Sequence, residues 1–239
     1  MKEPGPDLLH QVMELTWPAA GVERLGPWLI RDGQGGGQRV SAATAESKVS
    51  EADIAAAEDA MARLGQPQLF MLRPGDEQLN RMLAGRGYRV KDPVVFYSVP
   101  VSALTAIPVP RVSAFHLWPP LAIMVDLWAE GGVGATRLAV MDRVSLAKTA
   151  ILARNSDQPA GAAFVAISEN VAMIHAIEVT VSQRRQGVGA NILRAAAHWA
   201  QDRGASHLTL AVTRANAGAN ALYTSQGMTV VGHYHYRIK

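Results

Sequence analysis

The apolar positions of this 239-residue chain follow two periods, and the changes between them predict its secondary structure. Residues 207–213, HLTLAVT, alternate apolar side chains with others, which is the period of a β-strand. Residues 190–203 carry apolar side chains on one helical face, and Gly204 follows as a typical C-terminal stop. Two apolar runs, 160–168 and 171–180, predict adjacent strands joined by a short turn.

Start and stop signals predict three more elements. Ser50 with Asp53 resembles a capping box, and it predicts a helix over 51–64 that ends before a glycine. A further helix is expected at 217–226, again followed by glycine, and a final strand over 228–238.

A glycine-rich stretch, GQGGGQ at 33–38, has two interpretations. A phosphate-binding loop would need a helix directly after it, whereas a β-hairpin turn would need strands on both sides. No helical pattern follows, and short strand-like runs, 27–30 and 38–42, flank the glycines. We therefore expect a hairpin loop.

The chain also contains a weak internal repeat of strand, helix, glycine and strand. Residues 68–90 align with residues 207–230 when Gly87 is placed on Gly227, which is an offset of 140. The repeat is architectural, because the two copies share few identical residues.

A proline-rich stretch, 98–112, separates the two copies and favours an extended connector. We place the boundary near 105–110. The sequence therefore predicts two units, 1–107 and 108–239.

Composition narrows the class of protein. Cysteine is absent, which excludes disulfides and thiolate metal sites and fits a reducing, cytoplasmic location. The start of the chain lacks an apolar signal segment, and no uncharged apolar run approaches the ~20 residues of a membrane span, so we expect no membrane partner. The net charge of +3 is too small to indicate nucleic-acid binding. Residues 1–110 hold 11 Lys/Arg and 13 Asp/Glu, but residues 111–239 hold 12 and 7, so an anionic ligand is expected in the second half.

Residues 183–192, QRRQGVGANI, place two arginines and two glycines at the mouth of a predicted helix. Unpaired N–H groups and the helix dipole favour an anion there, and glycine lets it approach the backbone. A dinucleotide fingerprint would need a third glycine where Ile192 stands, and a P-loop would need Gly-Lys-Ser/Thr. The remaining pattern, Arg-x-x-Gly-x-Gly, fits a phosphate cradle or a plain turn.

A second pattern follows at 216–228, Asn-x-x-Ala-x-x-Leu-Tyr-x-x-x-Gly-Met. In this order and spacing, the two patterns resemble the GNAT superfamily of acetyl-CoA-dependent N-acetyltransferases over residues 111–239. The resemblance implies an α/β (α+β) protein with two tandem GNAT-like acyl-CoA N-acyltransferase folds, whose mixed central sheets are flanked by helices. The first half is then a degenerate copy, because residues 45–50, which align with the cradle, contain no glycine.

The same resemblance implies acetyl-CoA as the co-substrate and no metal. Backbone amides of the turn would hold the coenzyme pyrophosphate, the preceding strand would bind the pantetheine arm, and the second pattern would line the other side. The implied positions are Ile177, Glu178 and Val179 on the strand, Arg184, Arg185, Gln186, Gly187, Val188, Gly189 and Ala190 in the turn, and Asn216, Ala219 and Tyr223 beyond it. For either arginine, a solvated surface charge is the alternative.

Tyr223 is the implied general acid, because a tyrosine at this place in the family can protonate the leaving CoA thiolate. An ordinary half-buried helix tyrosine is the alternative. Leu83 stands at the equivalent position of the first half, so that half has neither the cradle nor the acid.

Several interpretations of the general base stay open. Many relatives place a glutamate where this chain has Met173, which cannot accept a proton. His175 shares a strand face with Met173 by alternation and titrates near neutral pH, although it could also simply pack in the sheet. Glu178 is the second candidate, if a bulge rotates it to that face. A water relay is the third.

The implied acceptor is a primary amine on a small molecule or peptide, and the acidic first half weakly suggests a cationic one. Residues 233–236, His-Tyr-His-Tyr, alternate on the last strand, so one pair could face the acceptor, although ordinary strand residues are the simpler interpretation. Trp118 and Trp128 flank a predicted helix, 119–129, that would cover the acceptor or pack in the core. A coenzyme-binding sensor and a transferase for another acyl-CoA remain alternatives, and the oligomeric state is open.

Overall fold

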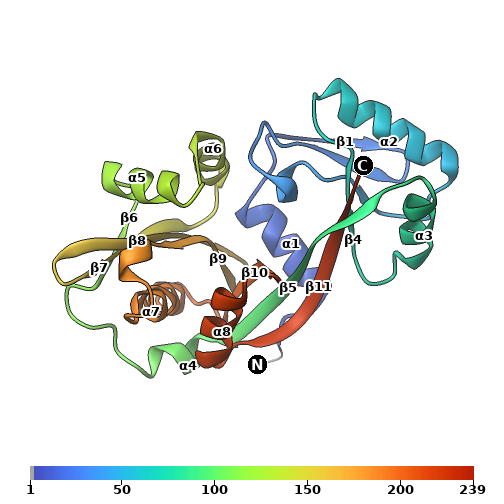
Figure 1. Cartoon of the computed structure of the whole chain (residues 1–239). Helices are drawn as coiled ribbons and strands as arrows, with labels where there is room; N and C mark the ends of the chain where they lie inside the picture. Colours follow the sequence, from blue (N-terminus) through green and yellow to red (C-terminus); the bar gives the residue numbers. More distant parts are fainter. Residues whose placement is uncertain (1–2) are drawn as a thin grey trace.

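The computed structural model describes residues 3–239, which form an eight-stranded mixed sheet, a three-stranded sheet and flanking helices (Figure 1). The large sheet has the order β4-β11-β5-β10-β9-β8-β7-β6, and the small sheet has the order β1-β2-β3. The strands are β1 (Gly21–Leu25), β2 (Trp28–Asp32), β3 (Thr44–Ala45), β4 (Leu69–Leu72), β5 (Arg89–Pro100), β6 (Ala114–Leu117), β7 (Lys148–Asn155), β8 (Gln158–Ser168), β9 (Val171–Val179), β10 (His207–Thr213) and β11 (Thr229–Ile238). The helices are α1 (Pro6–Thr16), α2 (Glu51–Arg63), α3 (Glu77–Gly85), α4 (Val101–Thr105), α5 (Ala122–Glu130), α6 (Ala135–Arg143), α7 (Val188–Gln201) and α8 (Ala217–Ser225), with short 3-10 segments η1 (Gln38–Val40) and η2 (Val181–Gln183). Within residues 3–239, no helix is both long enough and apolar enough to cross a membrane.

Most elements expected from the pattern are confirmed. β10 has the predicted bounds, and α7 begins two residues before the predicted start of that helix. α2 begins at the predicted capping box, in which the Asp53 amide donates to Ser50 Oγ (3.3 Å) and the Ser50 amide donates to the Asp53 carboxylate (2.8 Å). The helices α3 and α8 occupy matching positions at the offset of 140, as the internal repeat predicts.

The glycine stretch at residues 33–38 lies, as expected, in a loop between two consecutive antiparallel strands, β2 and β3, but the second strand is not where it was predicted. Residues 38–40 form η1 instead of a strand, and β2 pairs with β3 further along the chain. Gly37 has a φ of 101°, which favours glycine, and a Cβ on Gly36 would lie 2.6 Å from Val140 Cγ2 of α6. The glycines therefore let this loop pack directly against the second half of the chain.

The two halves share the large sheet by exchanging their last strands. β5 of the first half lies between β10 and β11, and β11 of the second half lies between β4 and β5 (Figure 1). As a result, β5, the last strand of the first half, pairs with β10 of the second half. Likewise β11, the last strand of the second half, pairs with β4 of the first half. The connector at residues 106–113 joins α4 to β6 without interrupting this sheet.

Helices cover both faces of the part of the sheet that belongs to the second half. α7 packs on one face with α4, and its buried alanines 195–197 allow close approach to the strands. α1, α5 and α6 pack against the other face. Trp128 of α5 is fully buried there, so it belongs to the core, which was one of the two expectations for it.

The strands β9 and β10 pair only at their beginnings, where Val171, Ala172 and Met173 align with residues 207–209. Beyond that point they separate and leave a gap in the sheet. β9 also carries a bulge: His175 pairs with Phe164 and Glu178 with Ala162, so three steps on β9 match two on β8. A one-residue bulge reverses which face each later side chain occupies, so the side chains of β9 beyond the bulge do not continue the alternation of those before it.

Candidate active site

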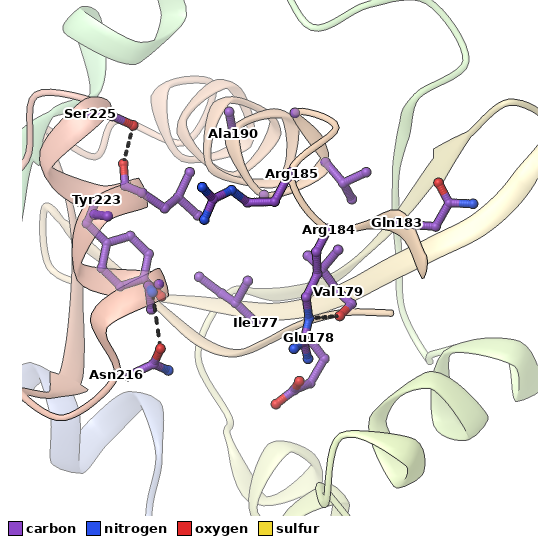
Figure 2. Close-up of a pocket in the computed structure, with 17 residues that line it drawn as sticks. Ile177, Glu178, Val179, Gln183, Arg184, Arg185, Ala190, Asn216, Tyr223 and Ser225 are labelled. Atoms are coloured by element: carbon purple, nitrogen blue, oxygen red, sulfur yellow. Dashed lines mark hydrogen bonds between the residues drawn. The ribbon is translucent and has the colours of Figure 1, made fainter. Parts of the chain in front are cut away.

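A cavity of about 690 Å³ opens between the end of β9, the start of α7 and α8 (Figure 2). Every position implied for coenzyme binding lines it except Gln186. Gln183, Gly218, Ala221, Leu222 and Ser225 line it as well, and sequence reasoning did not single these out. The cavity therefore lies where the end of β9 has separated from β10, and both short sequence patterns, 183–192 and 216–228, contribute residues to its lining.

The glycines of the turn have different physical functions. Gly187 is the N-cap of α7 with a φ of 83°, and nothing lies within 4 Å of the place where its Cβ would be. A Cβ on Gly189 would instead lie 2.7 Å from Leu222 Cδ2, so this glycine allows α7 to pack on α8. The amide of Asn191 donates to the Gly187 carbonyl (3.0 Å), and the amides of the first turn before it are free to point at a ligand.

Of the three polar side chains at 184–186 in the turn, two line the cavity and one points away from it. Arg185 lines the cavity and reaches from the turn toward α8 (Figure 2). Arg184 also lines it, but its Nε donates to the Val179 carbonyl (3.0 Å). Gln186 faces away, because its side chain donates to the Ser182 carbonyl and accepts from Asn155. The expectation that Gln186 lines the coenzyme site is therefore wrong for its side chain.

Tyr223 of α8 is only 6% exposed, and burial raises the pKa of its hydroxyl to about 12. Its ring packs beside Tyr97 of β5, with 5.6 Å between the ring centroids. The Tyr97 hydroxyl donates to Asn220 Oδ1 (3.1 Å), which fixes Tyr97 against α8. The first half of the chain thus supports the ring of Tyr223, and the hydroxyl has no hydrogen bond to any residue in 3–239.

His175 is buried on the other side of β9, and both of its ring nitrogens are engaged. Thr16 Oγ1 donates to the Val12 carbonyl (2.7 Å), so it accepts from His175 Nε2 (2.9 Å). The lone pair then lies on Nδ1, where Arg39 Nη1 donates at 3.3 Å. Burial and the charge of Arg39 both hold the pKa of His175 well below its usual range. This geometry opposes the expected role of His175 as a base, because a proton on Nδ1 would face a guanidinium.

Glu178 lines this cavity and also a second, smaller cavity beside it. The β9 bulge puts the Glu178 side chain on the same face of the strand as His175. The bulge is stabilised by Trp128, whose Nε1 donates to the Ala176 carbonyl (2.8 Å). Burial raises the pKa of the Glu178 carboxyl. A Cβ on Gly131 would lie 2.5 Å from Glu178 Cδ, so a larger residue at position 131 would require the Glu178 side chain to move.

The second cavity, of about 310 Å³, has walls from both halves of the chain. The first half contributes Trp17, residues 36–39 of the glycine-rich loop and Asp92. The second half contributes Arg137, the β9 bulge and the pair Tyr234 and Tyr236. The tyrosines of the 233–236 stretch thus face a cavity, whereas His235 contacts Asn80 elsewhere (3.2 Å). Among residues 3–239 there is no group of three or more His, Asp or Glu side chains that could hold a metal ion.

Comparison with known proteins shows which proteins this arrangement resembles. Residues 123–228 match the acetyltransferase (GNAT) family. The chain is 22% identical over 240 residues to YobR, an uncharacterized N-acetyltransferase of Bacillus subtilis (strain 168), with 97% of each chain covered. A GCN5-related N-acetyltransferase structure from Kribbella flavida has a TM-score of 0.70 at 18% identity and covers 97% of this chain and 94% of its own. A tandem GNAT protein from the clavulanic acid biosynthesis pathway has a TM-score of 0.61 at 12% identity, with 98% and 88% covered.

Proposed function

Because residues 123–228 match the acetyltransferase (GNAT) family, we propose that this chain is an acetyl-CoA-dependent N-acetyltransferase. It transfers the acetyl group to a primary amine by direct attack, with coenzyme and amine bound together. One observation carries this proposal: the cavity at the α7 turn and the second cavity meet at a single carboxylate, Glu178. Two substrates can therefore approach the same titratable group from opposite sides.

The residues around the α7 turn fit the coenzyme. The turn offers first-turn amides, open space at Gly187 and the cation of Arg185, which together suit a diphosphate. Residues 177–179 lie beyond the last β9–β10 pair, so their backbone groups on that side are available to a pantetheine arm. When bound, the coenzyme supplies the acetyl thioester.

Tyr223 acts as the general acid in this proposal. Its buried hydroxyl stays protonated over the physiological range, because its pKa is raised to about 12. A group in that state can donate a proton to a leaving thiolate but cannot serve as a base at neutral pH. Backbone N–H groups of the separated strand can stabilise the charge that develops on the thioester carbonyl oxygen.

Glu178 acts as the base, directly or through one water molecule. An attacking amine must lose a proton, and a carboxylate with a raised pKa accepts one more readily than an ordinary glutamate does. This reverses the order suggested by the sequence, in which His175 came first. His175 instead fixes Arg39 through its Nδ1.

The test is a screen of primary amines that follows release of the CoA thiol, with binding of acetyl-CoA measured separately by calorimetry. We expect turnover with at least one amine class, and we expect Tyr223→Phe and Glu178→Gln to lower kcat by roughly 10²–10⁴-fold while coenzyme affinity is retained. Binding without thiol release from any amine would instead indicate a coenzyme sensor. Faster turnover with propionyl-CoA than with acetyl-CoA would indicate a different acyl group.

A further inference from the structure

The second cavity holds two guanidinium groups that have no carboxylate partner among residues 3–239. Arg39 and Arg137 both line it, and neither forms an ion pair within 4.0 Å among residues 3–239. We propose that the acceptor is an amino acid or another small amine that carries a carboxylate, and that Arg39 and Arg137 bind this carboxylate while the amine lies at Glu178. This inference rests on the proposed function and adds the substrate class.

Arg39 is held in place before any ligand arrives. Its Nη2 donates to the Ala211 carbonyl of β10 (2.8 Å), and its Nη1 donates to His175 Nδ1 (3.3 Å). His175 is itself fixed by Thr16. A guanidinium has five N–H donors, so these two contacts leave donors for a ligand. Its side chain is partly buried, where a charge without a counter-ion is costly, and a ligand carboxylate would supply one.

Arg137 approaches the same cavity from α6. The place where a Cβ would stand on Gly37 is 3.5 Å from Arg137 Nε, so the guanidinium lies over the glycine-rich loop that carries Arg39. Its charge partly opposes the rise that burial causes in the pKa of the Glu178 carboxyl, which places it within electrostatic reach of that group. The glycines at 36 and 37 thus bring the two arginines, one from each half, to the same wall.

The second cavity is also lined by two carboxylates, those of Asp92 and Glu178. Asp92 Oδ2 accepts from Gln38 Nε2 (2.7 Å), so it already has a polar partner within the protein. The Glu178 carboxylate accepts no hydrogen bond from any residue in 3–239, and it lies on the side of the coenzyme cavity. A molecule with a carboxylate at one end and an amine at the other matches this separation of charge. The volume of about 310 Å³ suits a small acceptor, and two guanidiniums in its wall oppose a polycation.

The experiment compares acceptors in matched pairs. Free amino acids, including β- and γ-amino acids, are each assayed beside the corresponding carboxamide and the amine that lacks the carboxyl group, with acetyl-CoA and a thiol-release readout. The amine of the carboxamide is less basic than the amine of the amino acid, so a larger fraction of it is in the neutral form that attacks the thioester. This difference alone would favour the carboxamide, which is the opposite of what the proposal predicts. We expect the carboxylate form to have a kcat/KM about 10- to 100-fold above that of its carboxamide.

Variants assign that preference to the two arginines. Arg137→Gln and Arg39→Gln should each reduce the ratio of carboxylate to carboxamide kcat/KM, and Arg137→Glu should favour the amine without a carboxylate. Arg63→Gln removes the same charge from the exposed face of α2 and should leave the ratio unchanged. Calorimetric titration of the best amino acid into protein saturated with CoA should show affinity that falls in Arg137→Gln.

The outcomes separate the two proposals. Equal or faster turnover of amines without a carboxylate, or a ratio that persists in both arginine variants, would overturn this inference and leave the transferase proposal standing. If the wild-type protein releases no thiol with any amine, the proposed function fails. Absence of amino-acid binding to the CoA-saturated protein would then overturn the carboxylate site as well.

Discussion

The exchange of strands between the halves predicts that residues 108–239 cannot fold alone, although they contain the whole coenzyme cavity. β5, which would be missing, pairs with β10 over seven residues and separates β10 from β11. A ladder of this length makes about one hydrogen bond per residue pair, and at about 0.5–1.5 kcal/mol each these bonds amount to roughly 4–10 kcal/mol. Loss of the buried Tyr97 and Val99 of β5 adds about 1.5–3 kcal/mol for each side chain. This total is as large as the ~5–15 kcal/mol by which whole domains are stable.

The assay expresses residues 108–239 alone, residues 1–107 alone, and the two together. We expect each fragment alone to lack a cooperative thermal transition by circular dichroism, and the co-expressed pair to form a complex that regains one and binds acetyl-CoA. The reasoning would be refuted by a monomeric 108–239 fragment with a cooperative transition and full coenzyme affinity. That result would mean that β11 had moved into the place of β5 beside β10.

Three further predictions follow from single positions. Gly187→Glu should weaken acetyl-CoA binding by more than about 100-fold, because it places a carboxylate in the open space of the cradle, whereas Gly187→Asn, which tolerates positive φ, should retain most of the affinity by calorimetry. Burial lowers the pKa of His10 to about 3 from 6.5, so folding stability should be full above pH 6.5 and fall by up to about 1.4 kcal/mol per pH unit as the pH drops toward 3; denaturant titrations should show a shallower decline in His10→Phe. Trp128→Phe removes the hydrogen bond to the Ala176 carbonyl in the β9 bulge and should cost about 1–3 kcal/mol of stability in the same titrations and lower kcat; an unchanged free energy of unfolding and an unchanged kcat would argue that the bulge does not depend on this hydrogen bond.

The sequence predicted the local features of the site because local rules determine them. A glycine at a helix start, an N-cap such as Asn216 and a helical run leave direct traces in the order of residues. The amide of Ala219 donates to Asn216 Oδ1 (3.1 Å), and this short-range contact fixes one wall of the cavity. These positions therefore lie where the two sequence patterns indicated.

Features that depend on distant contacts were not visible in the sequence. α1 carries Thr16 to His175, and the burial that lowers the pKa of that histidine comes from elements far away in the chain. The β9 bulge needs Trp128 as a partner, and strict alternation could not place Glu178 without it. The exchange of β5 and β11 also left no trace, because each strand has the same pattern whichever neighbour it pairs with.

The structure also explains why a first half without a cradle accompanies the second half. A sheet whose strands separate leaves backbone groups without partners, and these must be satisfied if they are buried. Ala211 lies on β10 just beyond its last pair with β9, and the bond from Arg39 Nη2 satisfies its carbonyl. The same guanidinium engages His175 on β9, so one side chain of the first half bridges the gap from strand to strand. Loss of the first half would therefore remove the bridge that spans the separated strands, and with it one wall of the second cavity.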